Sequence, residues 1–141
     1  TENVPHIVAL GEAARLARTT LVQEATRMAA LRDRLHGLLA AAIPGLQLNG
    51  HPTERLPNTL NVSFPAVAGW QVLAAAPTVA ASTGSACHAG DHAVSGVLAA
   101  MGLTREAAAG AVRLSLGRFT TGNEIDAAAA ALSGAWKSLT A

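Results

Sequence analysis

A helical pattern of nearly forty residues opens this chain and limits the folds that it can adopt. Between residue 5 and about residue 43, apolar side chains recur at helical spacing, and most of the arginines in this segment fall between them. Pro5 suits a first helical turn, and Pro44 followed by Gly45 is a stop signal. A helix of this length either bridges two bodies or packs across one sheet and overhangs it.

The rest of the chain alternates short strands with short helices. The patterns predict strands at residues 46–48, 60–64, 78–82 and 111–116. They predict helices at residues 70–76, 93–101, 104–110 and 122–139. Thr104 is expected to cap one helix, and Thr121 with Glu124 forms a capping box for the last one. We therefore expect one α+β domain over residues 1–141, in which a small antiparallel sheet packs against helices in two layers.

Composition describes the core and excludes several functions. Half of the 141 residues are apolar and only 3% are aromatic, so we expect a thin, tightly packed core rich in alanine. The net charge of +1 argues against a nucleic-acid surface, and no apolar run reaches the ~18 uncharged residues of a membrane span. A single cysteine cannot form an internal disulfide, which fits a reducing, cytoplasmic compartment.

The only cysteine, Cys87, lies among small and polar residues. A buried cysteine usually lies in an apolar run, whereas the glycines, serines and histidines of residues 82–92 predict an exposed loop. Nearby histidines and the start of the expected helix at residue 93 could lower the pKa of this thiol, so Cys87 is a candidate nucleophile. On local context alone, an unreactive loop cysteine is an equal alternative.

The same loop also contains a possible set of metal ligands. Cys87, His88, Asp91 and His92 place four candidate ligands within six residues. Ligand sets this compact rarely close a tetrahedron, and no second cluster has zinc-like spacing. We therefore do not expect a metal site here.

Arg113 is the best candidate for an anion-binding residue. Val112, Leu114 and Leu116 share one side of the expected strand 111–116, so Arg113 projects from the other side. An arginine on a sheet face can hold a carboxylate through two hydrogen bonds. Taken by itself, a solvated surface arginine is the simpler alternative.

Four segments, in this order, resemble the C-terminal part of cysteine desulfurases, which belong to the class-V branch of the pyridoxal-phosphate aminotransferases. The segments that carry the resemblance are residues 1–5, 55–64, 82–87 and 112–121. The resemblance covers essentially the whole chain. It implies the small C-terminal domain of a fold-type I pyridoxal-phosphate enzyme, with the large cofactor-binding domain upstream.

The resemblance implies a reaction, a cofactor and partners. Such enzymes are homodimers that bind pyridoxal 5'-phosphate and convert L-cysteine to L-alanine. The sulfur is left as a persulfide on a loop cysteine and passes to an acceptor or iron–sulfur scaffold protein. Cys87 falls at that nucleophile and Arg113 at the arginine that holds the substrate carboxylate. Thr1 falls at a threonine that reaches the cofactor phosphate of the neighbouring subunit.

The departures from the family pattern define the alternatives. The family's Schiff-base lysine lies upstream of Thr1, and Lys137, the only lysine, falls on a solvated helix face. We therefore expect the isolated chain to be inactive. Cys87 followed by His88, with a second histidine at His92, resembles the pattern of selenocysteine lyases of the same superfamily. A selenocysteine lyase is therefore one alternative to a cysteine desulfurase. The other is a stand-alone sulfur carrier or docking module, in which Cys87 accepts sulfur without catalysis.

Overall fold

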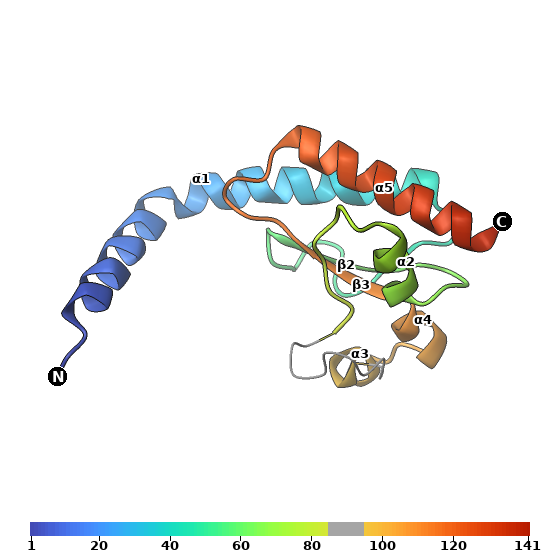
Figure 1. Ribbon diagram of the computed structural model, residues 1–141, viewed down its shortest axis with the longest axis horizontal. Coiled ribbons are helices and arrows are strands. Elements are labelled where there is room, and N and C mark those ends of the chain that lie inside the picture. Colours follow the sequence, from blue (N-terminus) through green and yellow to red (C-terminus); the bar gives the residue numbers. More distant parts are fainter. Residues whose placement is uncertain (85–94) are drawn as a thin grey trace.

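The computed structural model describes residues 1–84 and 95–141. In these ranges the helices and strands are α1 (Val4–Ala42), β1 (Gln47–Leu48), β2 (Thr59–Ser63), α2 (Gly69–Ala75), α3 (Gly96–Ala100), α4 (Arg105–Ala109), β3 (Ala111–Ser115) and α5 (Gly122–Thr140). Figure 1 shows α1 and α5 side by side over the sheet, with α3 and α4 on the opposite side of it. The expected α+β fold, a small antiparallel sheet packed with helices and a long N-terminal helix, is confirmed, and the short helices α3 and α4 add to the other side of the sheet.

The sheet is small and antiparallel, with the strand order β1-β2-β3. The strand expected over residues 78–82 is wrong, because only Ser82 pairs, in a single bridge to Arg113. The start of this segment forms a turn, in which the Val79 N–H donates to the Ala76 carbonyl at 3.0 Å. The segment therefore pairs with β3 only at its end. The helix expected from residue 93 begins at Gly96 within the described residues.

The core lies between the sheet and the α1–α5 layer. Alternate residues of β2 and β3 point toward the two helices, and the last third of α1 buries Leu35 and Leu39 against them. The largest buried side chains in the described ranges are leucine, isoleucine, valine and one phenylalanine, Phe64, and five alanines are buried as well. A second cluster, made by Leu98, Ala108 and Ala111, covers the start of β3 on its other face.

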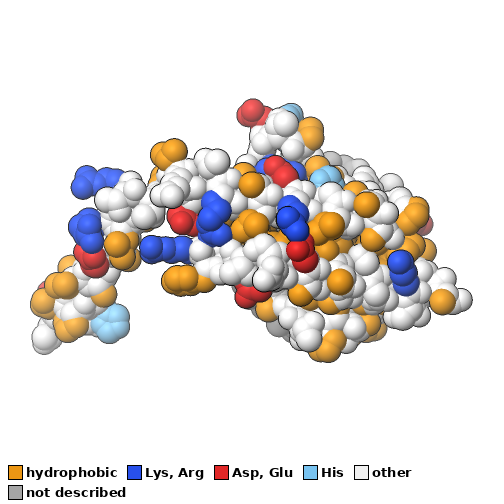
Figure 2. All heavy atoms as spheres, turned by 90° about the horizontal axis from the view of Figure 1, so that it is seen from above, with side chains coloured by type: hydrophobic (Ala, Val, Ile, Leu, Met, Phe, Trp, Pro, Cys, Tyr) orange, Lys and Arg blue, Asp and Glu red, His pale blue; other side chains and the backbone are white. Residues whose placement is uncertain are grey.

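The long helix overhangs the sheet rather than bridging two bodies within the described structure. Every residue from 1 to 19 is exposed, whereas the C-terminal part of α1 packs on α5 and β2. Figure 2 shows apolar side chains exposed along the overhanging arm. Val4, Ile7 and Val8 of this arm are each more than half exposed. In residues 1–84 and 95–141, no helix has the length and the apolar character that a membrane crossing requires.

The expected caps define where two helices begin. The Thr104 hydroxyl accepts a hydrogen bond from the Ala107 N–H at 3.2 Å, at the start of α4. At the start of α5, the Thr121 hydroxyl accepts from the Glu124 N–H at 3.3 Å, and the Glu124 carboxylate accepts from the Thr121 N–H at 2.8 Å. Both satisfy backbone groups that a helix end leaves unpaired.

Candidate functional site

Arg113 occupies the position that the alternation of β3 predicts. Val112, Leu114 and Leu116 are buried in the core, and Arg113 is exposed on the opposite face of the sheet. Within the described ranges, the Arg113 guanidinium makes no hydrogen bond or ion pair. A charged fork on an open sheet face can take a carboxylate bidentately.

The backbone of Arg113 also holds the point where the cysteine segment leaves the sheet. Its N–H donates to the Ser82 carbonyl at 2.7 Å, and the Ser82 N–H donates back to the Arg113 carbonyl at 3.2 Å. The Ser82 hydroxyl then donates to the Gly84 carbonyl at 2.7 Å. Cys87 follows three residues later and lies outside the described residues, as do His88, Asp91 and His92, the other candidate metal ligands.

Two asparagines that sequence reasoning missed lie in the same cross-strand row as Arg113. Asn61 on β2 is its direct cross-strand partner, and Asn49, just beyond β1, donates its backbone N–H to the Asn61 carbonyl at 2.9 Å. The Asn49 amide nitrogen donates to Asn61 Oδ1 and to Ser63 Oγ, each at 2.8 Å. The alternation of β2 was a signal in the sequence. Because Leu60 and Val62 point into the core, Asn61 between them must project from the opposite face, which is the face of Arg113.

Thr1 and Lys137 lie away from this face. Thr1 is exposed at the free end of the overhanging α1, far from the sheet in Figure 1. Lys137 is exposed in the last turn of α5, on the other side of the sheet from Arg113. Lys137, the only lysine of the sequence, is therefore on the opposite side of the sheet from the candidate anion-binding residue.

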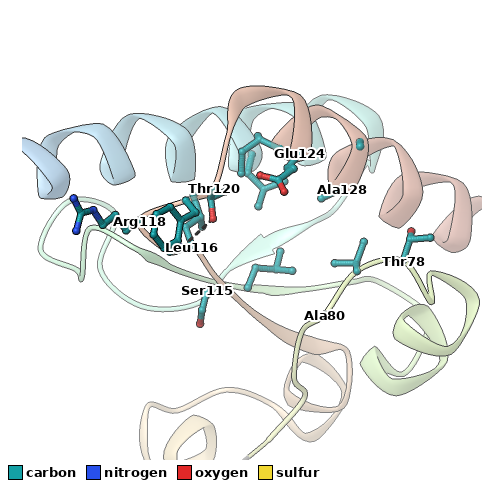
Figure 3. A pocket seen from close by; sticks show the side chains of 15 residues that line it. Thr78, Ala80, Ser115, Leu116, Arg118, Thr120, Glu124 and Ala128 are labelled. Atoms are coloured by element: carbon teal, nitrogen blue, oxygen red, sulfur yellow. Dashed lines mark hydrogen bonds between the residues drawn. The ribbon is translucent and has the colours of Figure 1, made fainter. Parts of the chain in front are cut away.

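A pocket of about 510 Å³ lies in the helical layer, between residues 78–80, the end of β3 and the start of α5. Its floor includes Leu114, Leu116 and Ile125, which point away from the Arg113 face. Figure 3 shows Glu124 and Thr120 at this pocket, whereas the Ser115 side chain points away from it. The pocket and the Arg113 face are thus two separate features of the sheet.

A charged cluster anchors the segment that leads into β2. Arg32 is buried and donates to the Leu56 carbonyl at 2.7 Å, while Arg32 and Arg55 both pair with Asp33 at 2.9 Å. Burial, and then the charge of Arg55, hold the pKa of His36 below its usual value. These contacts tie the loop before β2 to the helix α1.

The fold and the sequence define a member of the class-V aminotransferases. The model of the family described as "Aminotransferase class-V" matches residues 1–128, so the chain belongs to this family. Among curated relatives, the chain is 48% identical to "Cysteine desulfurase 2" of Trichormus variabilis, over 89% of this chain and 32% of the relative. It is 46% identical to "Cysteine desulfurase IscS" of Methanosarcina thermophila, over 89% of this chain and 31% of the relative.

Solved structures agree with this assignment. A "NifS-like protein" superposes with a TM-score of 0.80 and 31% identity, over 99% of this chain and 34% of that one. A NifS-like protein from Rickettsia africae gives a TM-score of 0.82 and 26% identity, over 97% of this chain and 36% of that one. The resemblance to cysteine desulfurases is confirmed, and the chain spans about a third of the length of its curated relatives.

Proposed function

We propose that this chain is the C-terminal small domain, residues 1–141, of a cytoplasmic, homodimeric, pyridoxal-phosphate-dependent cysteine desulfurase. The observation that carries the proposal is the double role of Arg113. Its guanidinium is exposed and without a partner among the described residues, and its backbone holds the root of the Cys87 segment. The candidate carboxylate-binding residue is thereby bonded to Ser82, from which the chain continues toward Cys87 five residues later.

In this proposal, Arg113 binds the carboxylate of L-cysteine and orients the substrate. The Cys87 thiolate attacks the substrate sulfur, so that an S–S bond forms while the substrate's C–S bond breaks. The carbon keeps the electron pair of the broken bond and takes up a proton, which gives L-alanine. The persulfide on Cys87 then passes to a sulfur acceptor or iron–sulfur scaffold protein.

The cofactor would supply the electron sink for this reaction. Because Lys137 lies on the other side of the sheet from Arg113, the lysine that binds the cofactor would come from residues outside this chain. Thr1, which is exposed at the end of the overhanging helix, would reach the cofactor phosphate of the neighbouring subunit, as the resemblance to cysteine desulfurases implies. The isolated chain would then be inactive.

The test uses the complete protein that contains this chain. We expect a pyridoxal-phosphate absorbance band and release of L-alanine from L-cysteine. Cys87→Ser should leave that band intact and abolish the persulfide, measured by thiol-specific labelling, because a hydroxyl cannot accept sulfur in this way. Arg105→Cys and Cys87→Ser in one chain place a thiol on the exposed start of α4 and serve as a control for non-specific sulfur uptake.

Several outcomes would overturn the proposal. Normal desulfuration by Cys87→Ser would remove Cys87 as the nucleophile. A complete protein without the cofactor band would favour the stand-alone sulfur carrier. A much higher kcat/KM for L-selenocysteine than for L-cysteine would favour the selenocysteine lyase.

A further inference from the structure

Arg113 and Asn61 form a close side-chain pair across the sheet. They face each other in the β2–β3 register. The Phe64 N–H bonds to the Gly110 carbonyl at 2.9 Å, and the Leu116 N–H bonds to the Asn58 carbonyl at 2.8 Å, so the even-numbered residues of β3 form the hydrogen-bonded pairs. Arg113 and Asn61 are therefore a non-hydrogen-bonded pair, the kind in which the Cα atoms are only ~4.5 Å apart and the side chains lie closest.

The carboxamide of Asn61 is oriented by its other neighbour. Asn61 Oδ1 accepts from Asn49 Nδ2 at 2.8 Å, on the β1 side of β2. The carbonyl end of this amide thus faces β1, and its N–H₂ end is left toward β3, where Arg113 lies. Within the described residues, Asn61 Nδ2 has no hydrogen-bond partner.

Asn49 holds Asn61 in this orientation, although its own carbonyl oxygen is left without a hydrogen bond in the described structure. Its side chain is buried, with 7% of the residue exposed, and its amide nitrogen donates to Asn61 and Ser63. Its Oδ1 is buried without a partner in the described structure. A buried carbonyl oxygen without a donor is costly, and the two hydrogen bonds that the Asn49 N–H₂ group donates, to Asn61 and Ser63, offset this cost.

We propose that Asn61 donates a hydrogen bond to the substrate carboxylate that Arg113 holds, and that Asn49 is the positioning residue that orients it. The inference rests on the proposed function and adds a second binding residue to the same site. Arg113 supplies charge and a bidentate fork, and Asn61 supplies a neutral donor at a fixed place beside it. The ligand recognised is the α-carboxylate of an amino acid.

The informative variant is Asn61→Asp in the complete protein. The aspartate keeps an oxygen that accepts from Asn49, so the network that holds the strand survives. It replaces the N–H₂ donor with a second carboxylate oxygen, which repels a bound carboxylate. We expect the dissociation constant of L-alanine, from spectral titration, and the KM for L-cysteine to rise at least tenfold, with a smaller change in kcat. Binding of L-alaninamide, which has no carboxylate, should change little.

Gln47→Glu is the matched control. It makes the same amide-to-acid change on an exposed residue of β1, two residues from Asn49, and should raise neither constant by more than about twofold. Asn61→Ala, which removes the donor without adding charge, should raise both constants severalfold. This second variant keeps the inference testable if the aspartate impairs folding.

Arg113→Gln, measured in parallel, separates the two proposals. If Arg113→Gln weakens L-alanine binding and neither Asn61 variant does, Asn61 is not a binding residue and the proposed function stands. If neither Arg113→Gln nor the Asn61 variants change it, the carboxylate site itself is wrong. A lower melting temperature with unchanged L-alanine binding would make Asn61 a structural residue only.

Discussion

At the scale of single residues, the best-defined electrostatic feature is the capping box of α5. The Glu124 carboxylate accepts hydrogen bonds from the N–H and the hydroxyl of Thr121, at 2.8 and 2.9 Å. These bonds favour the ionised form and hold the pKa of Glu124 below its usual value, with the backbone bond contributing most. The stability that they contribute is present above the unfolded-state pKa and is lost as the pH falls through the lower folded-state value.

Thr121→Ala should therefore raise the pKa of Glu124 toward its usual value, without removing the whole shift, because the backbone N–H remains. Carboxyl-carbon NMR titration measures this directly. The pKa of Glu12, which is lowered by its hydrogen bond to Arg15, should stay unchanged in the same variant. An unchanged Glu124 pKa would show that the hydroxyl plays no part.

At the scale of elements, one arginine ties α1 to the loop between β3 and α5. Arg27 Nη1 donates to the Thr120 carbonyl at 2.7 Å, and its Nη2 donates to the Arg118 carbonyl at 2.5 Å. The same side chain pairs with Glu24 at 2.9 Å on its own helix. Residues 117–120, which line the pocket, are thus held in place by a helix more than ninety residues earlier in the chain.

Arg27→Ala should lower the free energy of unfolding by about 1–3 kcal/mol, because two loop carbonyls lose a charged donor. Arg15→Ala is the matched control. Arg15 also pairs with a glutamate three residues earlier, but its side chain is 55% exposed and contacts no other element within the described structure, so the change should be within about 0.5 kcal/mol. Denaturant unfolding compares the two. Equal effects would mean that the loop contacts of Arg27 contribute nothing.

At the scale of the whole molecule, α1 consists of an exposed N-terminal arm and a C-terminal part that packs in the core. Its 39 residues form one continuous element, but residues 1–19 of the chain are entirely exposed, while Leu35 and Leu39 are buried under α5. A helical segment of about 15 residues without tertiary contacts is only marginally stable in water. The apolar side chains on the overhanging arm, Val4, Ile7 and Val8, have no core to enter in the described structure.

Amide hydrogen exchange of this chain should therefore show different protection in the two parts of α1. We expect weak protection over residues 4–19 and strong protection over residues 31–42, since the second range opens only with the core. Mass spectrometry of peptides from each range measures both. Uniform protection along the helix would contradict this division.

Local chemistry explains why much of the fold could be predicted. Pro5, Pro44, Thr104 and Thr121 act within one helical turn, so the helices that they bound were found nearly to the residue. The strand expected over residues 78–82 was predicted wrongly. Its residues have the pattern of a strand, but a strand forms only where the neighbouring strand β3 lies alongside. It does so only at Ser82.

The sequence by itself determined the length of α1, the ends of most helices, the face of β3 from which Arg113 projects and the family to which the chain belongs. Each of these depends on local periodicity, capping or motif. Only the tertiary structure decided which half of α1 packs, and that Asn49, Asn61, Arg113 and Ser82 lie in one row across the sheet. The physical reason is register, because the neighbours of a strand residue are chosen by segments dozens of residues away.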